Sequence, residues 1–185
     1  GEGDVATVVG YAAVYNADSE EMWGFYERIA PGAFNEVLDN DVRAYFNHDE
    51  NLLLGRTASG TLTLSTDDRG LKYEVTLPNT SYAADLVELM KRGDVTQSSF
   101  AFMIGEDYWE ERDGKTYRII TKISRLFDVS PVSMPAYPDA TSELKRDLEK
   151  PETDEPAPAA SAAGSEDPAP DDSDLYNYKS KLLNF

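Results

Sequence analysis

A strict alternation of apolar and polar side chains over residues 60–78 constrains the fold of this chain more than any other feature. The stretch reads "GTLTLSTDDRGLKYEVTLP", with the turn-forming tetrapeptide 67–70 at its centre. Because successive side chains of a strand point to opposite faces, this period of two predicts two antiparallel strands joined by a tight turn. A second hairpin is predicted in "DYWEERDGKTYRIITKI", with its turn at Asp113 and Gly114.

Two further patterns predict one more strand and a helix. The run "TVVGYAAVYN" is rich in β-forming residues and is interrupted by Gly10, which indicates a strand with a bulge or a close approach. The stretch "NTSYAADLVELMKRGD" (79–94) has apolar residues at helical spacing. Thr80 or Ser81 can cap the start of this helix, and Gly93 is expected to end it.

The remaining elements complete the predicted fold class. Shorter helices are expected to begin near Pro31 and near Thr141. A chain of 185 residues is long enough for one domain with a substantial core plus a tail. Together the elements predict a strand-rich α+β domain, organised as a closed or nearly closed β-barrel with helices packed outside it.

The composition changes after Arg146, and this change sets the expected domain boundaries. Residues 147–174 are rich in Pro, Ala and acidic side chains and contain almost no large apolar ones, so they are expected to be a disordered linker. Residues 175–185, "LYNYKSKLLNF", are apolar and slightly basic, and they are predicted to be a short docking segment, with an apolar chain end that has no binding role as the alternative. With residues 1–3 set aside as a cloning or processing remnant, residues 4–146 are the expected folded domain.

The charge and the absence of cysteine exclude several function classes. The chain has 17 basic and 35 acidic residues and a net charge of -18, so nucleic acid and anionic membranes are not expected partners. With no Cys it cannot form disulfides, thiolate metal sites or a cysteine nucleophile, which fits a reducing compartment. No apolar run approaches the roughly 20 residues that span a bilayer. A soluble, unexported protein is therefore expected.

His48 is the only histidine in the chain, and it lies in "YFNHDENLLLGRT" after a strand-like run. Histidine titrates near neutral pH without a perturbed environment, so His48 is a candidate general base. A metal site shared with Asp49 and Glu50 is a second interpretation, but adjacent strand residues point to opposite faces and a catalytic zinc normally needs three convergent ligands. The third interpretation is an ordinary solvated loop residue.

Candidate nucleophiles cluster in "GDVTQSSFAFMI" (93–104), directly after the predicted helix. Thr96, Ser98 and Ser99 lie at the start of an apolar, strand-like run, where a hydroxyl is well placed at a sheet edge. Because neighbouring strand residues face opposite ways, Ser98 and Ser99 cannot both point toward one base. The alternative is that both serines are turn and capping residues.

A candidate orienting acid lies in "SRLFDVSPVSMPAYPDA" (124–140). Asp128 is placed there between Phe127 and Val129 in a strand-like run. A buried carboxylate needs a partner, and an imidazole N–H is a natural one. An ion pair with Arg125 is the alternative interpretation.

Taken together, three stretches resemble the prohead maturation protease family of tailed phages. The resemblance is carried by "FNHDENLLLGRTASGTLTLSTDDRGL", "LMKRGDVTQSSFAFMI" and "LFDVSPVSMPAYPDA", in this order and with these gaps. The segments "GYAAVYN" and "ERIAPGAF" are also similar to this family, so the resemblance covers about residues 8–142. It implies a serine endopeptidase with a fold similar to that of herpesvirus assemblins, a compact β-barrel surrounded by helices.

The resemblance also implies a role for each candidate residue. The histidine of the family's N-H-[DE] segment is the general base, here His48, and the serine before the first Phe of its S-F-x-F segment is the nucleophile, here Ser99. The acid preceding V-S-P-V is the third member, here Asp128 where Glu is common. No metal or other cofactor is implied. A backbone N–H near Ser99 is the expected oxyanion donor, with Arg56 as the alternative.

Enzymes of this kind are packaged inside the immature capsid, in the bacterial host cytoplasm. They cut the scaffolding protein or the scaffolding region of the capsid protein, and often themselves. The resemblance therefore implies capsid or scaffolding protein as substrate, together with self-association of the protease. The alternative is a catalytically inactive capsid-assembly or scaffold-binding module of the same fold.

Overall fold

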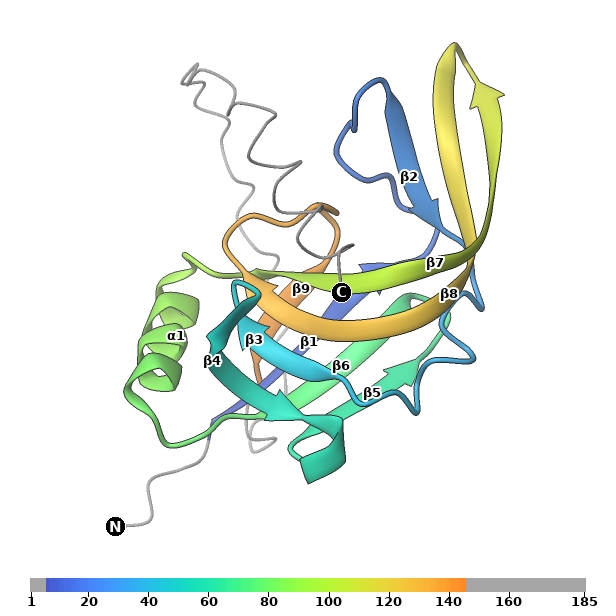
Figure 1. Cartoon of the computed structure of the whole chain (residues 1–185). Helices are drawn as coiled ribbons and strands as arrows, with labels where there is room; N and C mark the ends of the chain where they lie inside the picture. Colours follow the sequence, from blue (N-terminus) through green and yellow to red (C-terminus); the bar gives the residue numbers. More distant parts are fainter. Residues whose placement is uncertain (1–5, 146–185) are drawn as a thin grey trace. The chain divides into compact units, whose positions relative to one another are not determined.

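The computed structural model describes residues 6–145. The described residues contain nine strands, one α-helix and one short 3-10 helix (Figure 1). The strands are β1 (Thr7–Val14), β2 (Phe25–Ile29), β3 (Arg43–Phe46), β4 (Asp49–Arg56), β5 (Leu62–Thr66), β6 (Gly70–Thr76), β7 (Gln97–Arg112), β8 (Lys115–Val132) and β9 (Thr141–Leu144). The helices are η1 (Thr57–Ser59) and α1 (Ser81–Arg92). The mixed α+β, strand-rich class predicted from the sequence is confirmed.

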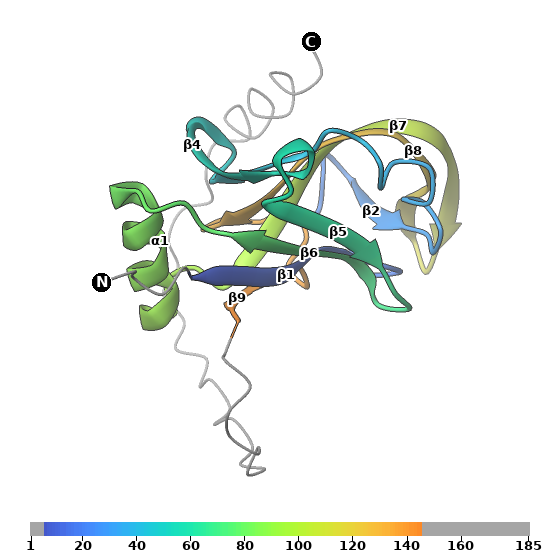
Figure 2. The ribbon, with the colours of Figure 1, turned by 90° about the horizontal axis from the view of Figure 1, so that it is seen from below.

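The strands form two sheets that enclose the core between them (Figure 2). The first sheet has the strand order β5-β6-β1-β9, and all of its pairs are antiparallel. Strand β8 is at the centre of the second sheet. One edge of β8 pairs with β7, which is antiparallel to it, and the other edge pairs with β2 and β3, which are parallel to it. Strand β4 then pairs antiparallel with β3. Within residues 6–145 the sheets do not close into a barrel, so this part of the prediction is not met.

Both predicted hairpins and the predicted helix are confirmed. Strands β5 and β6 pair across the turn at 67–69, and β7 and β8 pair across Asp113 and Gly114, whose φ angles of 54° and 74° suit a tight hairpin turn. Helix α1 begins after Thr80 and ends at Gly93, which has a φ of 82° and donates its N–H to carbonyls of the last helical turn. Thr80 occupies the N-cap position but makes no side-chain capping hydrogen bond. Local chemistry is therefore visible at the two turns and at the C-terminal end of the helix.

Gly10 has one of the two roles considered for it, a close approach between strands, whereas the bulge of β1 lies after it. Strand β1 pairs with β6 on one side and with β9 on the other, and its register with β6 shifts between Tyr11 and Ala13. A Cβ atom on Gly10 would lie 2.1 Å from the carbonyl oxygen of Thr141. A larger residue at this position would therefore push β9 away from β1.

Two predicted helices are wrong. The segment from Pro31 to Asn40 is a series of turns with hydrogen bonds from residue i to residue i−3, such as Val37 N–H to the Phe34 carbonyl at 3.1 Å. Gly32, with a φ of 85°, interrupts any regular helix there, although Phe34 and Val37 are buried as core residues. The segment beginning at Thr141 is strand β9, because its backbone pairs with β1.

The described residues therefore contain α1 as their only α-helix, and the expected set of helices surrounding a barrel is not found among them. None of the helices in this part of the chain is both long and apolar enough to cross a membrane. The predicted linker 147–174 and docking segment 175–185 lie outside the described residues.

A buried hydroxyl network joins the two sheets. The hydroxyl of Tyr73 on β6 lies 2.7 Å from Ser98 Oγ on β7 and 3.2 Å from Ser142 Oγ on β9. Ser98 Oγ donates in turn to the Thr141 carbonyl at 2.8 Å. Burial raises the pKa of Tyr73 to about 12, while its hydrogen bonds with Ser142 and Ser98 oppose this rise.

The raised pKa of Tyr73 predicts a loss of stability in alkali. An unfolded tyrosine deprotonates at about pH 10, whereas the folded one keeps its proton, so the free energy of unfolding should fall as the pH rises through this window. A pKa difference of two units corresponds to about 3 kcal/mol of the free energy of unfolding. About half of this contribution is lost near pH 11, and all of it above about pH 12. Urea unfolding between about pH 9 and pH 11 measures the loss. Tyr73→Phe should make the slope less steep without abolishing it, because burial also raises the pKa of Tyr137. An equally steep slope in this variant would contradict the prediction.

Candidate active site

His48 lies in the turn that joins β3 to β4. Asn47 and His48 both have a φ of 54°, and the flanking residues Phe46 and Asp49 are paired. Positive φ at both central residues defines a two-residue type I′ hairpin turn, in which Asn is favoured at the first position. Sequence reasoning placed His48 after a strand but missed this hairpin, because the second turn residue is His rather than the usual Gly. An Asn followed by one polar residue between two strand-like runs was the available signal.

The turn brings the imidazole of His48 against strand β8. His48 Nδ1 lies 2.6 Å from Asp128 Oδ1, and the two side chains are 4% and 6% exposed. The interpretation of His48 as a solvated loop residue is therefore wrong. A hydrogen bond between an imidazole N–H and a buried carboxylate fixes both the tautomer and the orientation of the ring.

Asp128 has a second hydrogen-bond donor besides His48. Ser130 Oγ, two residues further along β8, donates to the same Oδ1 atom at 2.7 Å. The predicted alternative partner, Arg125, instead places its guanidinium 4.9 Å from the ring centroid of Phe127. The Asp128 carboxylate is thus held by the imidazole and a hydroxyl.

The register of β7 on β8 determines which serine shares the face of Asp128. Ser99 lies opposite Ser130, and Ala101 lies opposite Asp128. Residues opposite each other point to the same face, and so do residues two apart on one strand. Ser99 therefore lies on the face of the sheet that carries the Asp128 carboxylate, diagonally across from it. It is buried, with 7% of its surface exposed.

Ser98 and Thr96 occupy different surroundings. Ser98 points to the opposite face of β7, where it is fully buried in the network with Tyr73. Thr96 precedes β7, is exposed, and accepts the N–H of Ser142 at its backbone carbonyl. Of the three candidate nucleophiles, Ser99 alone lies on the side of the sheet where His48 meets Asp128.

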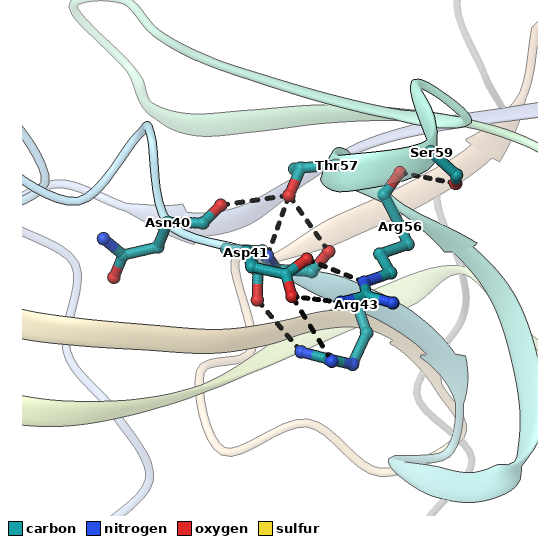
Figure 3. Close-up of polar contacts among 7 residues, drawn as sticks. Asn40, Asp41, Arg43, Arg56, Thr57 and Ser59 are labelled. Carbon is teal, nitrogen blue, oxygen red and sulfur yellow. Dashed lines mark hydrogen bonds and ion pairs between the residues drawn. The ribbon is translucent and has the colours of Figure 1, made fainter.

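Arg56 lies at the far end of the β3–β4 hairpin from His48. It is seven positions along the strand from Asp49, the first residue of β4, which corresponds to about 23 Å. Its guanidinium forms two hydrogen bonds with Asp41 (Figure 3), Nε to Oδ1 at 2.8 Å and Nη2 to Oδ2 at 2.5 Å. The hydrogen bond from Arg56 lowers the pKa of the Asp41 carboxyl. This position does not support the oxyanion role considered for Arg56.

The three adjacent residues considered as metal ligands do not form a metal-binding group in the described part of the chain. Asp49 Oδ1 accepts hydrogen bonds from the backbone and side-chain nitrogens of Asn51, both at 2.9 Å. Asp49 and Glu50 are exposed, whereas the His48 ring is buried against Asp128. Across residues 6–145, no group of three or more His, Cys, Asp or Glu side chains is arranged to hold a metal ion.

Comparison with known families identifies the chain. The sequence profile of the caudovirus prohead serine protease family matches residues 1–154. This chain belongs to that family. No curated protein matches the sequence.

The family assignment makes this prohead protease a serine protease of capsid maturation in tailed phages. Each of the three stretches that carried the resemblance contributes one strand, β4, β7 or β8, to the second sheet. A hydroxyl, an imidazole and a carboxylate on one sheet face are the groups that serine proteolysis requires. Because His48 comes from a hairpin turn and the other two from a strand pair, the second sheet holds all three on rigid elements.

Proposed function

We propose that this prohead protease uses Ser99, His48 and Asp128 as a catalytic triad. The 2.6 Å hydrogen bond between His48 Nδ1 and Asp128 Oδ1, buried on the sheet face that Ser99 shares, is the observation that carries the proposal. This hydrogen bond is compatible with an aspartate at position 128, where glutamate is common in the family, because the shorter side chain still reaches the imidazole.

The chemistry follows from these contacts. Ser99 Oγ attacks the carbonyl carbon of the scissile peptide while His48 Nε2 takes its proton. The imidazolium then gives that proton to the leaving amine, and the acyl group remains on Ser99. Water, deprotonated by the same imidazole, releases the acyl group and restores the serine. Asp128 stays ionised throughout, holding the tautomer and stabilising the imidazolium. A backbone N–H near Ser99 stabilises the oxyanion.

The substrates follow from the place where a prohead protease works. Phage prohead proteases act within the procapsid in the host cell. We propose that this one cuts the scaffolding protein, or the scaffolding region of the capsid protein, and also cuts itself. In this proposal residues 4–146 are the protease domain with a fold related to herpesvirus assemblins, 147–174 link it to the end of the chain, and 175–185 dock on scaffold or shell.

Co-expression with the capsid and scaffolding proteins of its phage tests this function. Intact-mass analysis should find a small set of defined fragments with the unaltered protease. A serine-directed fluorophosphonate added to the lysed sample should stop cleavage and add a single adduct, which peptide mapping should place on Ser99. Fragments that form at an undiminished rate despite the reagent would contradict serine catalysis.

The alternative function is a non-catalytic assembly module of the same fold. It predicts assembled particles with intact capsid and scaffolding proteins and no adduct on Ser99. The bonded His48–Asp128 pair favours the protease, because a scaffold-binding module has no chemical need for a buried imidazole held by a carboxylate.

A further inference from the structure

Where the strand ladder ends, two side-chain hydrogen bonds and one backbone hydrogen bond join the His48 turn to the end of β8. Strand β3 pairs with β8 at a single register position, Arg43 opposite Asp128. Beyond it the next contact is made by a side chain: the Tyr45 N–H donates to Ser130 Oγ at 3.3 Å. The backbone ladder therefore does not by itself fix the distance between the turn and the carboxylate.

Ser130 links strand β3 to the carboxylate. Its Oγ accepts the Tyr45 N–H and donates its own proton to Asp128 Oδ1 at 2.7 Å. Ser130 is completely buried, so water cannot replace either bond. Because the accepted N–H orients the hydroxyl, its proton points to the same oxygen atom that the His48 ring contacts.

Asn47 makes the second link, at the turn itself. Its N–H donates to the Pro131 carbonyl at 3.0 Å, and its Oδ1 accepts the N–H of Ser133 at 2.9 Å. These two bonds lie on either side of Val132, where β8 ends. They fasten the residue next to His48 to the strand that carries Asp128.

We propose that Ser130 and Asn47 are positioning residues that hold the His48 imidazole and the Asp128 carboxylate in their reactive arrangement. The inference rests on the proposed triad. Neither residue touches the reacting atoms. Their loss should lower kcat rather than raise KM, because a displaced imidazole transfers the proton less efficiently while the substrate still binds.

Two substitutions at Asn47 separate the hydrogen bond from the turn geometry. Asn47→Gly accepts the positive φ but removes Oδ1, whereas Asn47→Asp keeps an acceptor and also tolerates this conformation. We expect kcat to fall about 10- to 100-fold in Asn47→Gly, with KM changed less than about threefold. Asn47→Asp should keep most of the kcat of the unaltered protease.

Ser130→Ala should lower kcat by about tenfold for the same reason. Ser142→Ala is its matched control, because Ser142 is also a buried strand serine but bonds Tyr73 rather than Asp128. Thermal unfolding of both variants reports whether each is folded at the assay temperature. Ser142→Ala should lose stability and keep kcat.

The single histidine allows a direct readout of position. In protein labelled with ¹⁵N-histidine every imidazole signal belongs to His48. The Nδ1 proton should resonate at low field and should shift or broaden in Asn47→Gly and Ser130→Ala, but not in Ser142→Ala. Unchanged resonances together with undiminished kcat in both variants, while Ser99→Ala is inactive, would overturn the inference. If the unaltered protease does not cleave, the proposed catalytic triad is contradicted. The His48 resonances would then still test whether Ser130 and Asn47 position the imidazole.

Discussion

Ser99→Ala is expected to reduce kcat for cleavage of the capsid or scaffolding protein by about 10⁶-fold, the loss seen when a serine protease loses its nucleophile. The substitution removes one oxygen from a buried position on β7 and leaves the imidazole without a hydroxyl to deprotonate. Defined fragments should therefore disappear from the intact-mass spectrum. Quantitative mass spectrometry of a time course measures the rate.

Ser98→Ala is the matched control for this substitution. It removes the same atom from the neighbouring residue, but on the opposite face, where Ser98 bonds the Tyr73 hydroxyl and the Thr141 carbonyl. Leaving these buried groups without a partner should lower the free energy of unfolding by about 1–3 kcal/mol while cleavage continues. The opposite pattern, an inactive Ser98→Ala and an active Ser99→Ala, would show that Ser98 rather than Ser99 is the nucleophile.

Asp128→Asn is expected to lower kcat by about 10⁴-fold with little change of backbone. The amide has the same shape as the carboxylate, so packing is preserved. It cannot stabilise the imidazolium by charge, and its NH₂ group favours the tautomer in which Nδ1 of His48 lacks a proton. Steady-state kinetics on a peptide taken from a mapped cleavage site would measure this change.

Asp139→Asn controls for the change of net charge. Asp139 is exposed in the loop between β8 and β9, and its replacement removes one negative charge without touching the imidazole. It should cleave at the rate of the unaltered protease. An equal loss in both variants would mean that total charge, rather than the bond to His48, explains the effect of Asp128→Asn.

Sequence reasoning succeeded where neighbouring residues decide the structure. The hairpin turning at Asp113 and Gly114 and the helix ending at Gly93 depend on turn and capping residues within a few positions. It failed at Pro31, where the chain forms a series of turns that includes the left-handed Gly32, and at Thr141, where pairing with β1 overrides a weak local preference.

In the candidate active site, too, some features depend on neighbouring residues and others on tertiary contacts. The alternation of β7 determined from sequence alone that Ser98 and Ser99 face opposite ways, because side-chain direction in a strand depends only on parity. The sequence could not decide which of them faces the core, since that depends on how β7 packs against Tyr73. The family resemblance supplied the choice of Ser99, and the register on β8 gives it a physical reason.

Local sequence patterns by themselves determined the β5–β6 and β7–β8 hairpins, the helix and the opposite directions of neighbouring serines, because short-range sterics and backbone hydrogen bonding set these features. Only the tertiary structure decided that His48 meets Asp128, which lies 80 positions away in the chain. That contact requires the β3–β4 turn to be fastened to the end of β8, and it depends on packing between elements that no local pattern encodes. The same holds for the change of Arg56 from possible oxyanion donor to partner of Asp41.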